Sequence, residues 1–212
     1  MSIAKLKKLI IAPHVDDEVL GCGGILDKKS FVYYASIDES RVPPDPVHRI
    51  PLKARLQELE ATAAYLGFSY EVNQKSLVNF LIEQEVKDEL ERVINTVHPD
   101  LVCLPHPGYN QDHRTVFHAA QIALRPHDVN WFVPRVVVYE GIHDAIWSDQ
   151  RFRPVLFVPI DIERKLQAYQ LQSSQVRGMR SPEHLRQLAA LRGAAVGVPY
   201  AEAFEILRWV EK

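Results

Sequence analysis

Residues 9–24 read Leu-Ile-Ile-Ala-Pro-His-Val-Asp-Asp-Glu-Val-Leu-Gly-Cys-Gly-Gly. The apolar run 9–12 is short and bounded by Pro13, which predicts a buried strand. The residues that follow predict a helix near 18–28, so a strand leads almost directly into a helix. That succession is the first half of a strand-helix-strand unit with parallel strands. The stretch therefore favours an α/β fold.

The rest of the chain continues this alternation of strands and helices. It predicts a doubly wound, mostly parallel Rossmann-like sheet flanked by helices, as one domain over residues 1–212. The proline-rich loop 38–51 is interpreted either as a wall or lid over a site or as an ordinary surface loop. Strands are expected near 7–12, 31–37, 69–72, 100–104, 134–139 and 155–160, and helices near 18–28, 50–66, 82–97, 112–124, 161–173 and 182–194.

An unusual concentration of charge follows the first strand. Three adjacent carboxylates beside the His14 imidazole repel one another unless a cation or protons relieve them. If the helix begins near Asp17, then His14 and Asp17 converge on one point, while Asp16 is directed to a neighbouring one. Imidazole nitrogen and carboxylate oxygen suit a zinc-type ion, whose catalytic sites use about three protein ligands. One ligand is therefore missing from this segment.

The best source of the missing ligand is the segment 104–116, Leu-Pro-His-Pro-Gly-Tyr-Asn-Gln-Asp-His-Arg-Thr-Val. It also follows an apolar run, residues 101–104. Both histidine-bearing loops would leave the carboxyl ends of parallel strands, which is the edge where open α/β sheets carry their sites. Two distant segments are thus expected to meet at one place.

Together these motifs resemble the zinc-dependent N-deacetylases of the PIG-L/LmbE type. The first family motif is His-Pro-Asp-Asp-Glu followed by Gly-x-Gly-Gly, and here only Val15 departs from it. The resemblance runs almost from end to end and predicts an LmbE-like fold. Its further points are Arg55 with Glu58, Asp112-His113-Arg114, Tyr139-Glu140, residues 157–162 with Lys165, Tyr169 and Gln175, Arg192-Gly193, and residues 200–204.

The resemblance implies a metal-dependent amide hydrolase that removes acetyl from an N-acetylated amino sugar or sugar conjugate. On matching positions, zinc would be held by His14, Asp17 and His113, with Asp16 as general base. The chemistry agrees, because zinc lowers the pKa of water from about 16 to near 7 and a carboxylate can take its proton. By the same resemblance, Arg55 would bind a polar part of the substrate.

One departure concerns the proton and oxyanion chemistry. Many family members have a second histidine three residues before the metal-binding one, where this chain has Asn110. Asparagine cannot shuttle a proton, but it can donate a hydrogen bond to an oxyanion, so Asn110 is assigned a stabilising role. Asp16 is then the simplest group to return its proton to the leaving amine, and Tyr109 and His106 are the next candidates. Tyr109 is also a candidate substrate contact.

Simpler interpretations remain open for several of these residues. Asp17 and Glu18 could complement the dipole of the helix that follows, although capping does not explain His14 together with three glycines. Glu18 and Asp112 are expected to support the metal ligands rather than bind the metal. Arg55 could instead belong to a surface salt bridge. Two other functions also stay open: an amidase for a bulkier amide, such as a thiol conjugate, and a degenerate metal-binding or glycan-binding protein.

Composition limits the class of protein. A chain of 212 residues with 47% hydrophobic content can bury a full core. Its net charge of −2 gives no basic footprint for nucleic acid or a membrane surface. With two distant cysteines and no signal peptide discerned, we expect a reducing, cytoplasmic location. The expected partner is a small N-acetylated sugar, and a homo-oligomer is compatible with the sequence.

Overall fold

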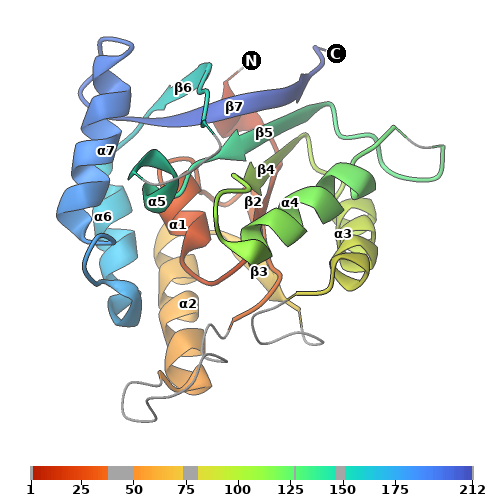
Figure 1. Cartoon of the computed structure of the whole chain (residues 1–212), viewed down its shortest axis with the longest axis horizontal. Helices are drawn as coiled ribbons and strands as arrows, with labels where there is room; N and C mark the ends of the chain where they lie inside the picture. Colours follow the sequence, from red (N-terminus) through yellow and green to blue (C-terminus); the bar gives the residue numbers. More distant parts are fainter. Residues whose placement is uncertain (1, 38–49, 74–80, 127, 147–150, 212) are drawn as a thin grey trace.

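The computed structural model describes residues 2–37, 50–73, 81–126, 128–146 and 151–211. They form a seven-stranded sheet with helices on both faces (Figure 1). The strands are β1 Lys8–Ala12, β2 Ser30–Tyr34, β3 Ser69–Val72, β4 Leu101–Pro105, β5 Arg135–Tyr139, β6 Leu156–Pro159 and β7 Ala201–Trp209. The α-helices are α1 Asp17–Cys22, α2 Leu52–Leu66, α3 Glu83–Val97, α4 Gln111–Ala123, α5 Ile142–Ile146, α6 Ile162–Gln170 and α7 Pro182–Ala194; Ile3–Lys5 and Ser173–Gln175 are single 3₁₀ turns.

The strand order is β3-β2-β1-β4-β5-β7-β6. Every neighbouring pair from β3 to β5 is parallel, whereas β7 runs antiparallel to both β5 and β6. The prediction of a doubly wound, mostly parallel sheet is therefore confirmed. The order reverses between β1 and β4, and in such sheets this reversal leaves a crevice at the carboxyl ends of the strands.

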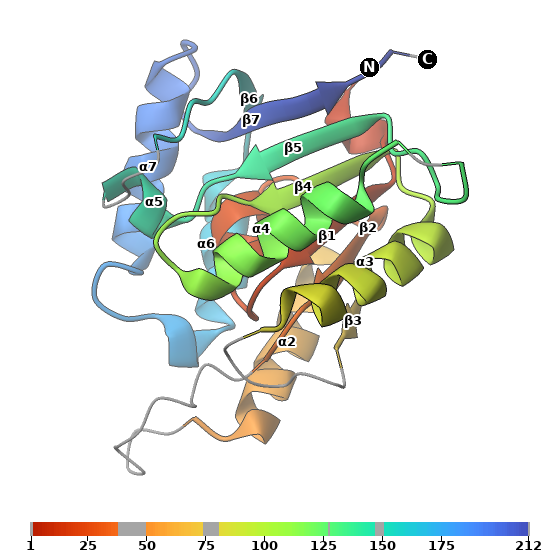
Figure 2. The ribbon, with the colours of Figure 1, turned by 45° about the vertical axis from the view of Figure 1, so that its right-hand side comes forward.

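Helices cover both faces of the sheet (Figure 2), and a hydrophobic layer of side chains lies between the sheet and the helices on each face. On β1, Ile10 and Ala12 face the layer that contains α1, α2, α6 and α7. Leu9 and Ile11 face the opposite layer, which contains α3 and α4. All four side chains are fully buried, which explains why residues 9–12 of β1 are apolar without alternation. Burial of both faces makes β1 the rigid base from which the His14 loop leaves.

Three elements differ from the sequence expectation. Helix α1 ends at Cys22 rather than near residue 28, with Gly23 as its C-cap and with Gly24 so close to Ile160 that a Cβ there would clash. The single-turn helix α5 and the last strand, β7, were not predicted. Strand β7 is buried over its first four residues and partly or fully exposed over the remaining five, so its sequence shows no uniform period.

The loop expected near the site is described only at its end. Most of the loop 38–51, interpreted as a wall or lid, lies outside the described residues, which resume at residue 50. Within the described parts of the chain, no helix combines the length and apolar character that crossing a bilayer requires.

Candidate active site

The turn between β1 and α1 brings His14 and Asp17 together. The backbone N–H of His14 donates to Asp17 Oδ2 at 2.9 Å, which closes the turn. The same oxygen lies 3.4 Å from His14 Nδ1. Both side chains are buried. The three-residue spacing therefore places an imidazole nitrogen and a carboxylate oxygen on one point, as the sequence predicted.

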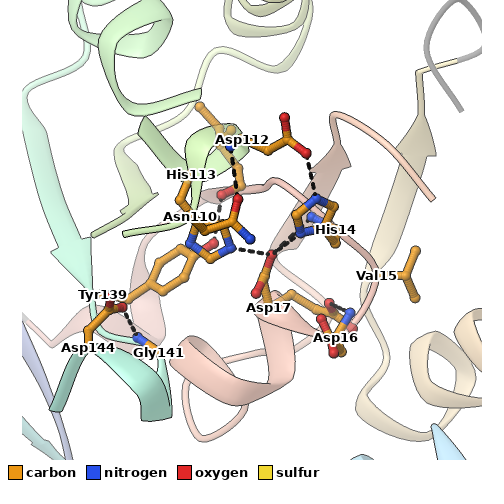
Figure 3. Close-up of polar contacts among 12 residues, drawn as sticks. His14, Val15, Asp16, Asp17, Asn110, Asp112, His113, Tyr139, Gly141 and Asp144 are labelled. Carbon is orange, nitrogen blue, oxygen red and sulfur yellow. Dashed lines mark hydrogen bonds and ion pairs between the residues drawn. The ribbon is translucent and has the colours of Figure 1, made fainter. Parts of the chain in front are cut away.

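Helix α4 brings His113 to the same point. His113 Nε2 lies 3.2 Å from Asp17 Oδ2, and one ligand atom from each of His14, Asp17 and His113 lies within 4.8 Å of the others. Figure 3 shows the three side chains pointing toward one another. Helix α4 starts here because Asn110 is its N-cap, and Asn110 Oδ1 accepts the Asp112 N–H at 2.8 Å.

The chemistry of this donor set fits a metal ion. Burial, the largest influence, would raise the pKa of Asp17, but the neighbouring His113 and His14 hold it well below its ordinary range. A buried, ionised carboxylate that meets two imidazole nitrogens needs positive charge between the three groups. Two nitrogens and one oxygen are a ligand set typical of catalytic zinc. His14, Asp17 and His113 are therefore the residues that could hold the ion.

Asp112 orients one of these ligands. Its Oδ2 lies 3.1 Å from His14 Nε2, and its Oδ1 accepts the Leu81 N–H at 3.0 Å. The carboxylate is buried. A carboxylate bound to one ring nitrogen fixes the tautomer of the histidine and directs the other nitrogen to a metal. The Asp112 carboxylate therefore bridges the His14 ring and the backbone of Leu81.

Asp16 is separate from this group of donors (Figure 3). It is fully buried, and its backbone has φ 130° and ψ −30°, a conformation rarely adopted by residues other than glycine. It precedes α1, yet its side chain makes no capping hydrogen bond. Instead, Arg180 Nη1 donates to Asp16 Oδ2 at 2.5 Å. The backbone thus directs this carboxylate away from helix capping and toward Arg180.

Glu18 supports the strained turn through its side chain. Its Oε2 accepts the Asp16 N–H at 2.9 Å, and its Oε1 accepts a hydrogen bond from Gln172 Nε2 at 2.6 Å. Burial raises the pKa of Glu18 to about 7. Glu18 therefore contacts the backbone of the motif rather than the donor group.

The two predicted residues of α2 hold loops in place. Arg55 is buried, and its Nη2 donates to the Val15 carbonyl at 2.5 Å. Glu58 accepts the Ser174 N–H at 2.8 Å and so anchors the segment after α6. Neither is among the described residues that line the pocket beside the donor group. In this structure, the Arg55 guanidinium is hydrogen-bonded to the backbone of Val15, the residue before Asp16.

A pocket of about 240 Å³ opens beside the donor group. Tyr109, half exposed, and Asn110 form part of its wall. The complete described lining is His14, Asp17, Leu20, Tyr109, Asn110, His113, Gly141, Ile142, His143, Asp144 and Arg180.

Sequence reasoning missed His143, Asp144 and Arg180 in this lining. A signal did exist for the first two, because they follow β5, whose carboxyl end lies at the same sheet edge as those of β1 and β4. Arg180 had no such signal. It belongs to the irregular segment between the second 3₁₀ turn and α7, and only the tertiary fold brings it to Asp16.

Several solved structures share this fold. The conserved protein TT1542 from Thermus thermophilus is 22% identical, with 98% of this chain and 97% of that chain covered and a TM-score of 0.74. The N,N'-diacetylchitobiose deacetylase from Pyrococcus horikoshii is 24% identical, with 96% and 84% covered and a TM-score of 0.75. GalB, the 4-carboxy-2-hydroxymuconate hydratase from Pseudomonas putida, is 21% identical, with 97% and 99% covered and a TM-score of 0.77.

Sequence comparison identifies the family to which the chain belongs. At such identities the structural matches establish the fold alone, and they include both a deacetylase and a hydratase, so chemistry must be argued from the site. No curated protein sequence matches the chain. Residues 9–124, more than half of the chain, match the profile of the PIG-L family, described as GlcNAc-PI de-N-acetylase. Because this match contains His14, Asp16, Asp17 and His113, the chain belongs to the PIG-L family.

Proposed function

We propose that this protein is a zinc-dependent hydrolase that removes the acetyl group from an N-acetylated amino sugar or sugar conjugate and releases acetate. The observation that carries the proposal is the convergence of His14 Nδ1 and His113 Nε2 on Asp17 Oδ2, at 3.4 and 3.2 Å. Membership of a family described by a de-N-acetylase supports the reaction type. The chain acts as a single domain in this proposal.

Zinc held by His14, Asp17 and His113 would polarise the amide carbonyl and lower the pKa of the attacking water. Asp16 accepts the proton that the water loses, and Arg180, 2.5 Å from its Oδ2, favours the ionised carboxylate that a base requires. Asn110 donates through its amide nitrogen, since its Oδ1 is already occupied by the cap of α4. The proton on Asp16 then passes to the leaving amine.

The size and lining of the pocket support a small polar substrate. About 240 Å³ lies below the range of pockets that enclose drug-sized ligands. An acetamido group and the adjoining part of one sugar ring are therefore better candidates than a large acyl group. Tyr109 offers an aromatic face at the rim, where sugar rings commonly stack.

The direct test is acetate release from a panel of N-acetylglucosamine conjugates, with zinc-loaded protein and with protein treated with a chelator. We expect turnover only in the loaded protein. A second panel varies the acyl group on one amine. Preference for a bulky acyl group would favour the amidase alternative, and retained metal with no turnover on any amide would favour a metal-binding or glycan-binding protein.

Two variants separate the roles of base and ligand. Asp16→Asn is expected to retain zinc but lose most turnover, because an amide cannot accept the proton. His113→Ala is expected to lose zinc. His118→Ala is the matched control, since His118 lies on the same helix α4 with an exposed side chain. Normal turnover in Asp16→Asn would refute the assignment of the base.

A further inference from the structure

The pocket contains a third histidine that the proposed chemistry has not used. His143 lies on α5, after β5, and lines the same pocket as His14 and His113. It is partly buried and is not a member of the group of donors that could hold a metal. The His143 imidazole therefore borders the same pocket as the three residues that could hold the metal.

The turn that carries His143 is held in place. The Gly141 N–H donates to Asp144 Oδ2 at 2.8 Å, which closes the turn on both sides of His143. The imidazole packs edge to face against Tyr109, with ring centroids 6.1 Å apart and planes at 82°. Two independent segments, the turn after β5 and the loop before α4, therefore set the position of this ring.

The surroundings of His143 favour the neutral imidazole. Burial, and then the positive charge of Arg180, lower the pKa of His143 below its ordinary value. A bound dication would lower it further. The neutral ring carries one N–H donor and makes no strong charge repulsion with a metal. The charged and titratable groups around it are Arg180, Asp144, Asp17, His113 and Tyr109.

The tetrahedral intermediate of amide hydrolysis places negative charge on the former carbonyl oxygen, and fixed donors stabilise this charge. We propose that His143 is a further catalytic residue, whose neutral imidazole donates its N–H hydrogen bond to this oxygen. The inference rests on the proposed function. Asn110 contributes the other side-chain donor from the opposite segment, and no proton is transferred by His143. Proton return to the amine stays with Asp16.

The experiment compares zinc-loaded wild type with His143→Ala, His143→Gln and His118→Ala. A missing oxyanion donor lowers kcat by about 10²–10³-fold. We expect that loss in His143→Ala, with KM changed by less than about threefold because the ground-state carbonyl needs the bond less. His143→Gln keeps an N–H donor, so it should recover most of kcat. Zinc content and melting temperature should match wild type in all variants.

A binding measurement gives a readout besides turnover. In a phosphonamidate analogue of the substrate, tetrahedral phosphorus replaces the acyl carbon and carries the anionic oxygen. Calorimetry should show its Kd raised about 100-fold in His143→Ala, whereas the Kd of the product amine stays unchanged.

The outcomes are distinguishable. A wild type that is inert on every amide refutes the proposed function and the inference with it. An active wild type with normal kcat and normal analogue binding in His143→Ala refutes the inference alone. If wild-type kcat falls as pH rises above neutrality and His143→Gln abolishes that fall, then His143 is a proton donor and the neutral-donor assignment is wrong.

Discussion

Arg180 donates from Nη1 to Asp16 Oδ2 at 2.5 Å, joining the segment before α7 to the turn after β1. Asp16 is fully buried, and the Arg180 side chain is 15% exposed at the pocket wall. A buried carboxylate without a cation would tend to take up a proton. The contact therefore couples the ionisation of the proposed base to the structure of a distant loop.

Removing this cation should destabilise the protein. Arg180→Ala removes the guanidinium that pairs with the buried Asp16 carboxylate, and breaking a buried ion pair in this way costs about 3–5 kcal/mol. Urea denaturation measures the loss. Arg186→Ala is the control, because its pair with Glu163 is exposed and should contribute less than about 1 kcal/mol. Equal losses in the two variants would contradict the structural role of Arg180.

Asp112→Asn should weaken zinc binding by about 10–100-fold. The new amide can still accept the Leu81 N–H, but its nitrogen would face His14 Nε2, which would then have to accept a hydrogen bond. That tautomer places the proton on His14 Nδ1, the atom that faces Asp17. Competition with a chelating dye gives the Kd. Asp88→Asn, at an exposed position of α3, is the control.

Unaltered zinc affinity in Asp112→Asn would show that the tautomer of His14 is set by something other than Asp112. A loss of the same size in Asp88→Asn would show that the effect is not specific to the site.

Glu18 should make stability depend on pH in the metal-free protein. The unfolded chain releases this proton near pH 4.5, whereas the folded protein keeps it up to about pH 7, because burial raises the pKa. The folded state therefore binds more protons in this window, and the free energy of unfolding falls as pH rises through it, by roughly 3 kcal/mol. Glu18→Gln should remove this contribution, since Gln172 can turn its amide to accept from the new group.

Denaturation midpoints of wild type and Glu18→Gln, measured with a chelator between pH 4.5 and 8, test this dependence. The two curves should converge at low pH and separate at high pH, with the variant the more stable. Parallel curves would mean that Glu18 does not titrate in this range.

Gly21→Ala should destabilise the contact between α1 and β5. A Cβ on Gly21 would lie 2.1 Å from Cδ2 of the buried Tyr139 ring, whose hydroxyl donates to the Ile11 carbonyl at 2.9 Å. The ring cannot move without losing that bond, so we expect a cost of about 1–3 kcal/mol. In a Tyr139→Leu background the cost should shrink, as a double-mutant cycle would measure. An unchanged cost in the Tyr139→Leu background would mean that the destabilisation by Gly21→Ala does not come from a clash with the Tyr139 ring.

Local patterns predicted much of the fold and part of the site. The four apolar residues before Pro13 indicated β1, and amphipathic spacing located α3 within one residue of its start. The carboxyl ends of parallel strands lie at one edge of the sheet, and this predicted that the segment of His113 meets that of His14. The missed strand β7 lies between β5 and β6 in the sheet although it follows both in sequence, so no local pattern reveals its neighbours.

By itself, the sequence determined the strand-to-helix turn that carries His14, Asp16 and Asp17, because residues within one turn converge through backbone geometry alone. Only the tertiary structure decided which charge faces Asp16 and which ring faces the pocket. The sheet-edge rule could have placed the segment of His143 at the site, but not its ring on the pocket wall. Arg180 reaches Asp16 through the packing of a segment that is remote in sequence, and long-range packing leaves no periodic trace in the residues that it brings together.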